Sequence, residues 1–130
     1  MNHLDIKIFN EYNNELEIAW NKLYDEKINN PFQSFDWLAH WQKTIGQSEY
    51  KSLPVSVLIN YKSQPIALLP FSVRKILGVK VLEWSGGSQT DYMGPIFIEK
   101  FFKINEMKNV WEFLLIKLPK HDVIFLKKQF

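Results

Sequence analysis

The sequence predicts an α/β (α+β) protein in which a central mixed, mostly antiparallel sheet is flanked by helices. The spacing of apolar residues changes several times along the chain between the period of a strand and the period of a helix. Apolar residues make up 46% of the chain and aromatic residues 15%, which is enough for a well-filled core. With 130 residues, the chain is expected to form a single domain, 1–130, in the order β-α-α-β-β-β-α-β.

The first strand and the first helix are predicted from two different periods. Residues 4–9 (LDIKIF) alternate apolar and charged side chains, which is typical of a half-buried strand. A helix is expected over 13–27, where four apolar residues have i, i+3, i+4, i+7 spacing: Leu16, Ala19, Trp20 and Leu23. Pro31 is expected to keep this helix from continuing, because proline lacks an N–H donor and disfavours helical angles in the residue before it.

A second helix is expected to begin at Ser34 and to end at Gly46. The Ser34 side chain can cap the first turn, and the negative charge of Asp36 suits the positive end of a helix. Apolar residues then repeat along one face: Leu38, Trp41 and Ile45. Glycine is the residue most often found just after a helix, so Gly46 is read as the stop signal.

The middle of the chain predicts three strands. Val55, Val57 and Ile59 alternate with other residues, the segment YKSQ is read as a turn, and 65–73 (PIALLPFSV) is an apolar run typical of a buried strand. Pro70 removes one donor from that run, so a bulge or a local edge is expected there. A turn around Gly78 leads into a further strand at 79–84.

The last third of the chain predicts a helix between two extended segments. A short extended segment (PIFI) precedes six residues with helical spacing: Met107, Val110, Trp111, Leu114, Leu115 and Leu118. Pro119 closes this helix, and 122–126 (DVIFL) is expected to form the final buried strand. Such a strand needs a neighbour on its open edge, so self-association or a partner chain is expected.

Composition narrows the function classes. The chain has no cysteine, which removes thiolate chemistry and disulfides and fits a reducing compartment, and no stretch is long and apolar enough for a membrane span. A cytoplasmic protein is therefore expected. The three histidines are far apart in sequence, so no metal site is predicted. Residues 51–130 carry a net charge of +6 against −4 for 1–50, but their cations are scattered, and no nucleic-acid partner is predicted.

The candidate site is the segment 85–95 (SGGSQTDYMGP), in which two adjacent glycines are followed by polar side chains. It can be a turn, in which Gly86 and Gly87 adopt positive φ angles, or a loop that binds a ligand. A phosphate site is disfavoured, because Asp91 is negative and about ten residues separate the loop from the next helix. As an acceptor site, it would offer Ser88, Gln89, Thr90, Asp91 and Tyr92 as hydrogen-bonding groups.

Three further residues are candidates for this site. Trp37 and Trp41 lie one helical turn apart, so they can form either an aromatic wall for a ligand or part of the core. Glu83 and Asp91 are the carboxylates nearest the loop, and deprotonation of an amine requires one carboxylate as general base. Asp91, which lies within the loop, is the predicted base.

Three stretches together resemble a known family. They are NPFQSFDWLAHWQKTIG, PVSVLINYKSQPIALLPFSVRK and VLEWSGGSQTDYMGPIF, and the similarity extends over about 30–126. The chain resembles the N-terminal half of CelD/BcsL-type acetyltransferases, a bacterial branch of the GNAT superfamily related to FemAB-like transferases. This resemblance implies a GNAT-like fold, acetyl-CoA or another acyl-CoA as donor, and an amine-bearing small molecule or a sugar as acceptor. Proteins of this type are often associated with envelope or polysaccharide biosynthesis.

The chain departs from this family in its cofactor half. Family members are usually longer, and their second half carries the coenzyme A site, so this chain is expected to correspond to the first half only. The nearest segment to the superfamily's glycine-containing pyrophosphate loop, RKILGV, does not have the required spacing. Two functions remain open. The chain is either the acceptor-side portion of an N-acyltransferase, or a non-catalytic GNAT-like module that acts through self-association or a partner.

Overall fold

A computed structural model describes residues 4–25, 29–87, 94–98 and 104–126, apart from the side chains of 104–109. The predicted order of elements is confirmed, with one short strand added before the last helix. The elements are β1 (Leu4–Phe9), α1 (Asn14–Leu23), the 3-10 turn η1 (Pro31–Gln33), α2 (Phe35–Trp41), the π-helical η2 (Gln42–Tyr50), β2 (Leu53–Tyr61), β3 (Gln64–Ile76), β4 (Val79–Trp84), β5 (Ile96–Phe97), α3 (Ile104–Lys117) and β6 (Val123–Phe125).

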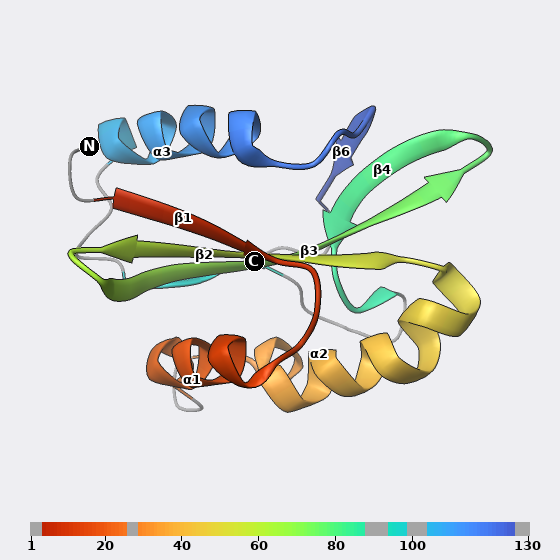
Figure 1. Cartoon of the computed structure of the whole chain (residues 1–130), viewed down its shortest axis with the longest axis horizontal. Coiled ribbons are helices and arrows are strands. Elements are labelled where there is room, and N and C mark those ends of the chain that lie inside the picture. Colours follow the sequence, from red (N-terminus) through yellow and green to blue (C-terminus); the bar gives the residue numbers. More distant parts are fainter. Residues whose placement is uncertain (1–3, 26–28, 88–93, 99–103, 127–130) are drawn as a thin grey trace.

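The described strands form one mixed, mostly antiparallel sheet, as expected from the sequence, with six strands where five were predicted. Its order is β1-β2-β3-β4-β6, and β5 pairs separately with β3. All pairs are antiparallel except β4 with β6, which run parallel. A parallel pair needs a crossover connection, and α3 lies in the connection between these two strands. Helices α1 and α2 cover one face of the sheet and α3 covers the other (Figure 1).

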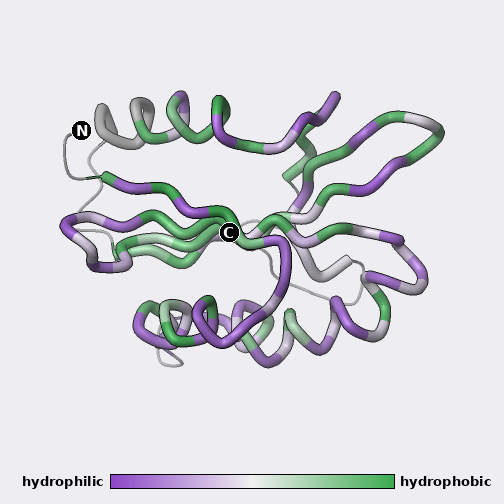
Figure 2. Tube along the Cα trace, in the orientation of Figure 1, coloured by the Kyte–Doolittle hydropathy of each residue, from purple (hydrophilic) through white to green (hydrophobic). Residues whose placement is uncertain are grey.

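Each face of the sheet contributes to its own apolar core, because side chains alternate along a strand. Val55, Val57 and Ile59 point to one side, as predicted, and pack with residues of α3 such as Leu114. The opposite face packs against α1 and α2 through a second cluster: Phe9, Leu16, Ala19, Trp20, Phe35, Leu38, Leu58, Leu68 and Ile96. Apolar residues follow the central strands between the two helical layers (Figure 2).

The first helix begins where the sequence indicated and ends earlier. The Asn13 side chain accepts a hydrogen bond from the Leu16 N–H at 2.9 Å and caps the start of α1. The helix ends at Leu23, not at Lys27, because Tyr24 adopts an extended conformation. The Tyr24 hydroxyl donates to the Asn30 carbonyl at 3.3 Å, so the chain already turns toward η1 at this point.

The second helix is longer than predicted, and Gly46 is not its stop signal. Ser34 caps α2, as expected, by accepting from the Trp37 N–H at 3.2 Å. The helix then continues as the π-helical η2 to Tyr50 and stops before Lys51, which has a φ of 52°. A Cβ atom on Gly46 would lie 2.7 Å from the Trp41 ring. Glycine is therefore required here for close packing of the indole and not for helix termination.

Strand β3 changes neighbours halfway along its length. Its residues Ala67 and Leu68 pair with β5, whereas 71–76 pair with β4. Pro70 lies between these two segments, so its missing N–H falls on a local edge, one of the two arrangements expected there. The bulge lies elsewhere, where the β2–β3 register shifts between Ile59 and Asn60. The chain between β4 and β5 leaves the sheet at this change of neighbours.

Candidate functional site

The candidate loop begins at Ser85, which is held tightly at the end of β4. The Ser85 N–H donates to the Pro70 carbonyl at 2.8 Å, and its hydroxyl donates to the Phe71 carbonyl at 3.0 Å. The next two residues, Gly86 and Gly87, have φ angles of 120° and 57° and are buried. Residues with a Cβ atom rarely adopt such angles, so the predicted conformational reason for the two glycines is confirmed.

The other end of the loop is held by Gln33, a buried polar residue of η1. Its side-chain amide donates to the Pro95 carbonyl at 3.2 Å and approaches the Gly94 carbonyl at 3.5 Å. Its side-chain oxygen accepts from the Asn30 N–H at 2.9 Å and completes a capping box. The Gln33 side chain therefore joins the start of η1 to Gly94 and Pro95, just before β5.

Both ends of the loop thus lie on the sheet face that α1 and α2 cover. The predicted acceptor-binding residues lie between these ends and outside the described part of the chain: Ser88, Gln89, Thr90, Asp91 and Tyr92. Their position is bounded by Gly87 on one side and Gly94 on the other. The geometry therefore fixes where the loop leaves and rejoins the fold.

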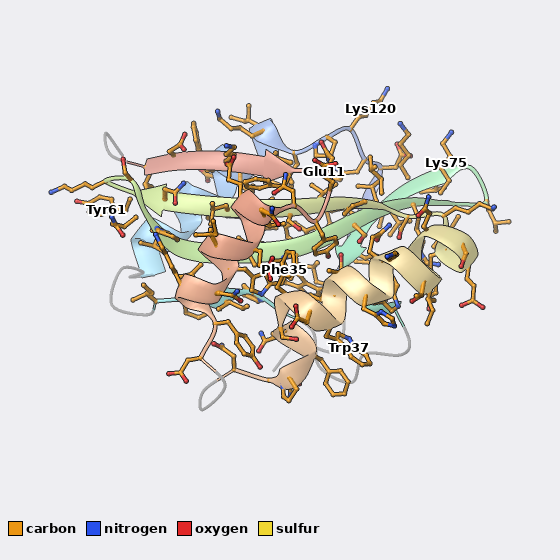
Figure 3. The ribbon with its side chains drawn as sticks, turned by 60° about the horizontal axis from the view of Figure 1, so that its bottom comes forward. Glu11, Phe35, Trp37, Tyr61, Lys75 and Lys120 are labelled. Carbon is orange, nitrogen blue, oxygen red and sulfur yellow. The ribbon has the colours of Figure 1, made fainter. Side chains whose placement is uncertain are left out.

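The two tryptophan candidates differ in burial and in their aromatic neighbours. Trp41 has only 4% of its surface exposed, and its ring packs edge-on against Tyr50 at 5.4 Å between centroids. Trp37 is partly buried and packs edge-on against Phe32 at 5.0 Å. Phe35 lies between the helices and the sheet, whereas Trp37 lies farther out along α2 (Figure 3). Trp41 belongs to the core, and Trp37 is the indole with surface to offer a ligand.

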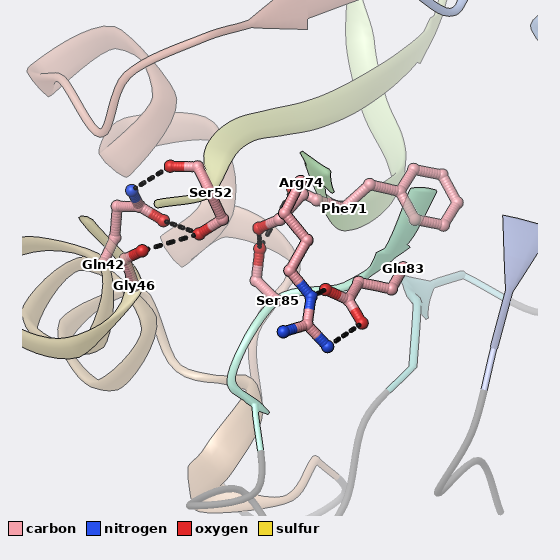
Figure 4. A network of polar contacts seen from close by, with 8 residues as sticks. Gln42, Gly46, Ser52, Phe71, Arg74, Glu83 and Ser85 are labelled. Carbon is pink, nitrogen blue, oxygen red and sulfur yellow. Dashed lines mark hydrogen bonds and ion pairs between the residues drawn. The ribbon is translucent and has the colours of Figure 1, made fainter. Parts of the chain in front are cut away.

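A partly buried ion pair lies close to the first residue of the loop. The Arg74 Nε atom is 2.5 Å from the Glu83 Oε2 atom, and the Arg74 Nη2 atom donates to Glu83 Oε1 at 3.3 Å (Figure 4). The guanidinium also stacks over the Tyr50 ring, 4.6 Å from its centroid. The Glu83 carboxylate is thus committed to a structural pair, which leaves Asp91 as the carboxylate candidate for a general base.

Four hydroxyl groups from separate elements meet beside this ion pair, and we call them the hydroxyl cluster: Tyr12, Ser56, Ser72 and Ser85. The hydroxyls of Ser72 and Ser85 bond to one another. Tyr12 precedes α1, and its hydroxyl lies beside the hydroxyls of Ser85 and Ser56. This hydroxyl is fully buried, although the residue as a whole is partly exposed. Burial of this hydroxyl raises the pKa of Tyr12 to about 12, and the contacts with Ser85 and Ser56 offset part of that effect.

The raised pKa of Tyr12 predicts a loss of stability at alkaline pH. The unfolded phenol ionises near pH 10, whereas the folded phenol keeps its proton until about pH 12, so the folded state binds more protons in this window. The free energy of unfolding should therefore fall by roughly 2 to 3 kcal/mol between pH 10 and pH 12 from this residue alone. Urea unfolding of wild type and Tyr12→Phe measures it, because the variant should lack this part of the decrease. If the free energy of unfolding fell equally with pH in wild type and in Tyr12→Phe, the raised pKa of Tyr12 would be contradicted. Tyr61→Phe is the control for loss of a phenol elsewhere.

Sequence reasoning missed the hydroxyl cluster, the Arg74–Glu83 pair and the role of Gln33. A signal was present, because serine interrupts otherwise apolar strand segments in VSV and FSV and follows the tryptophan in EWS. A polar residue at a position that the strand period buries needs a partner inside the protein. Such positions mark a buried polar site even when the partners cannot be read from the sequence.

Comparisons of the chain with protein-family models, with curated proteins and with solved structures found no match. Among the residues that the structure describes, no helix is long and apolar enough to cross a membrane. The same residues contain no group of three or more His, Cys, Asp or Glu side chains arranged to hold a metal ion.

Proposed function

We propose that this chain is the acceptor-side portion of a GNAT-type N-acyltransferase, and that the loop 85–95 binds the amine that receives the acyl group. The observation that carries the proposal is the fixing of both ends of a glycine-containing polar loop, at Ser85 and through Gln33, on one face of the sheet. Fixed ends limit the conformations available to the residues between them, which lowers the entropic cost of ordering them around a ligand.

The topology supports the resemblance from which this proposal starts. Four strands in antiparallel order are followed by a helical crossover to a parallel partner, β6, with α1 and α2 on the opposite face from α3. A GNAT domain is expected to open after its fourth strand, and here the chain leaves the sheet at the end of β4. The link to envelope or polysaccharide biosynthesis and the cytoplasmic location stay predictions.

Asp91 is the residue that we propose as general base. An amine is protonated near neutral pH and attacks only after losing a proton, which a nearby carboxylate can accept. Ser88, Gln89, Thr90 and Tyr92 would orient the acceptor through hydrogen bonds, and Trp37 would offer an apolar surface to a sugar ring. Glu83 is not proposed, because deprotonating the amine would require it to leave Arg74.

The described start of the loop does not fit the pyrophosphate of an acyl-CoA. A pyrophosphate cradle needs free backbone N–H groups at the start of a helix, but the Ser85 N–H is bonded to the Pro70 carbonyl, and Gly86 and Gly87 are buried at the end of a strand. We therefore expect calorimetry to detect no micromolar binding of acetyl-CoA to this chain alone. Micromolar binding would contradict this view of the cofactor site.

The role of Asp91 is tested by Asp91→Ala. The variant should bind amino sugars or polyamines at least tenfold more weakly than wild type in calorimetry, while its melting temperature changes by less than about 2 °C, because a carboxylate that acts on a ligand and not in the core contributes little to stability. Asp5→Ala, which changes an exposed carboxylate of β1, is the matched control. A large fall in melting temperature with no change in binding would make the loop a purely structural turn.

A second candidate function rests on an exposed apolar surface. Four exposed apolar side chains lie on the sheet face opposite α3, with exposed fractions of 39% to 53%: Ile76, Val79, Val123 and Phe125. Ile76 and Val79 flank the tip of the β3–β4 hairpin, and the other two lie on β6 beside Val81 and Glu83. We call them the β6 patch. Lys75 and Lys120 lie at this same end of the molecule (Figure 3). Such a surface favours a non-catalytic module that acts through self-association or a partner chain.

Light scattering at micromolar concentration tests this second function. We expect a dimer or larger species, and we expect Phe125→Glu to shift the chain to a monomer, because a charge in a buried apolar contact is strongly disfavoured. Leu77→Glu is the control, since Leu77 is 99% exposed at the hairpin tip and lies outside the β6 patch. A monodisperse wild-type monomer would contradict this second function and leave the acceptor-side function as the only candidate.

A further inference from the structure

Two groups of the hydroxyl cluster are buried without a hydrogen-bond partner among the residues that the structure describes. The hydroxyl oxygens of Tyr12 and Ser56 expose less than 1 Å² each and form no hydrogen bond of normal geometry within the described part of the chain. Ser56 as a whole is 1% exposed. An unpaired buried hydroxyl is strongly disfavoured, and buried polar groups in proteins almost always have a partner.

The neighbouring hydroxyls of Ser85 and Ser56 lie beside the Tyr12 hydroxyl but form no hydrogen bond of normal geometry with it. Ser85 already donates to the Phe71 carbonyl and contacts the Ser72 hydroxyl, so its proton is committed. Arg74 and Glu83, the charged groups described beside the cluster, are paired with one another. The surroundings of Tyr12 and Ser56 therefore contain neutral hydroxyls whose acceptor and donor capacity is only partly used.

We infer that the hydroxyls of Tyr12, Ser56 and Ser85 together bind one internal water molecule. A buried water typically makes about three hydrogen bonds to polar groups that otherwise lack partners, and three hydroxyls from three elements supply that number. Water both donates and accepts hydrogen bonds, so one neutral molecule can supply the missing partner of the Tyr12 hydroxyl and of the Ser56 hydroxyl. A bound ion is disfavoured, because every group of the cluster is neutral.

The water joins segments that are far apart in sequence. Tyr12 precedes α1, Ser56 lies in β2, and Ser85 is the first residue of the candidate loop. The bridge therefore fixes the base of the loop to the entry of the first helix, in addition to the bonds from Ser85 to β3. This inference does not depend on the proposed acyltransferase function.

The sign of the stability change in Tyr12→Phe tests the inference. If the water is bound, the variant removes one of its partners, and the melting temperature should fall by about 3 to 5 °C. If the two hydroxyls are unpaired, the variant removes a buried group that lacks a partner, and the melting temperature should rise or stay unchanged. Tyr61→Phe, outside the cluster, is the matched control. A rise or no change in Tyr12→Phe would overturn the inference.

A second measurement separates a bridging water from a direct bond. In water–protein cross-relaxation NMR, wild type should show cross-peaks between a long-lived water and the Tyr12 ring protons. These cross-peaks should be lost in the double variant Tyr12→Phe/Ser56→Ala, whose melting temperature should fall by less than the sum of the two single falls. A lower melting temperature in Tyr12→Phe without water cross-peaks in wild type would overturn the inference in favour of a direct hydrogen bond.

Discussion

Replacing Trp20 by alanine should lower the free energy of unfolding by about 4 kcal/mol. Trp20 is fully buried, and its ring packs edge-on against Phe35 at 5.5 Å between centroids. Its indole N–H donates to the Gln33 carbonyl at 2.8 Å, so the substitution leaves both a cavity and an unpaired buried carbonyl. Urea denaturation followed by circular dichroism measures the change.

Ile18 provides the control for this prediction within the same helix. Its side chain is 61% exposed, so Ile18→Ala should change the free energy of unfolding by less than about 0.5 kcal/mol. A loss in Trp20→Ala as small as that of the control would show that α1 does not pack on the sheet through this residue. The account of the core on the α1 and α2 face would then be wrong.

Replacing Gln33 by leucine should lower the free energy of unfolding by about 3 kcal/mol, because several buried backbone groups lose their partner at once. The Gln33 residue is 3% exposed. Its side chain accepts a hydrogen bond from the Asn30 N–H and donates to the carbonyls of Gly94 and Pro95. Leucine keeps the volume but supplies neither donor nor acceptor.

Hydrogen exchange shows whether the effect of Gln33→Leu reaches the loop. The Ile98 N–H donates to the Ile66 carbonyl at 2.9 Å, just beyond β5, and its exchange should accelerate at least tenfold in the variant. Gln47→Leu, which changes an exposed glutamine of η2, should alter neither stability nor exchange at Ile98. Unchanged exchange at Ile98 in Gln33→Leu would show that this side chain does not hold the end of the loop.

Most of the fold could be predicted because the apolar pattern of each element follows its burial: β1 and α1 bury one face, whereas β2 and β3 are apolar on both faces. The period-two pattern of LDIKIF and the helical spacing around Trp20 each require one side to face the core, and the structure has both as predicted. The caps at Asn13 and Ser34 also follow local rules, since each side chain bonds to an N–H three residues ahead.

The remaining features depend on contacts between distant segments, which no local pattern encodes. Gly46 has the local signature of a helix end, but close approach of the Trp41 ring is what requires glycine there. The two residues of β5 form a strand only because half of β3 is free to pair with them. The hydroxyl cluster likewise gathers residues from four segments, so its serines stand out in the sequence but their partners do not.

Mapping of amine binding by NMR tests the central claim most directly, namely that the loop 85–95 recognises an amine acceptor. Isotope-labelled chain would be titrated with glucosamine, and with N-acetylglucosamine as the control whose amine is blocked. We predict that glucosamine shifts the amide signals of 85–95 and of the start of α2, that N-acetylglucosamine does not, and that Asp91→Ala abolishes the shifts while remaining folded. Equal shifts with both sugars, or shifts confined to other segments, would contradict the claim.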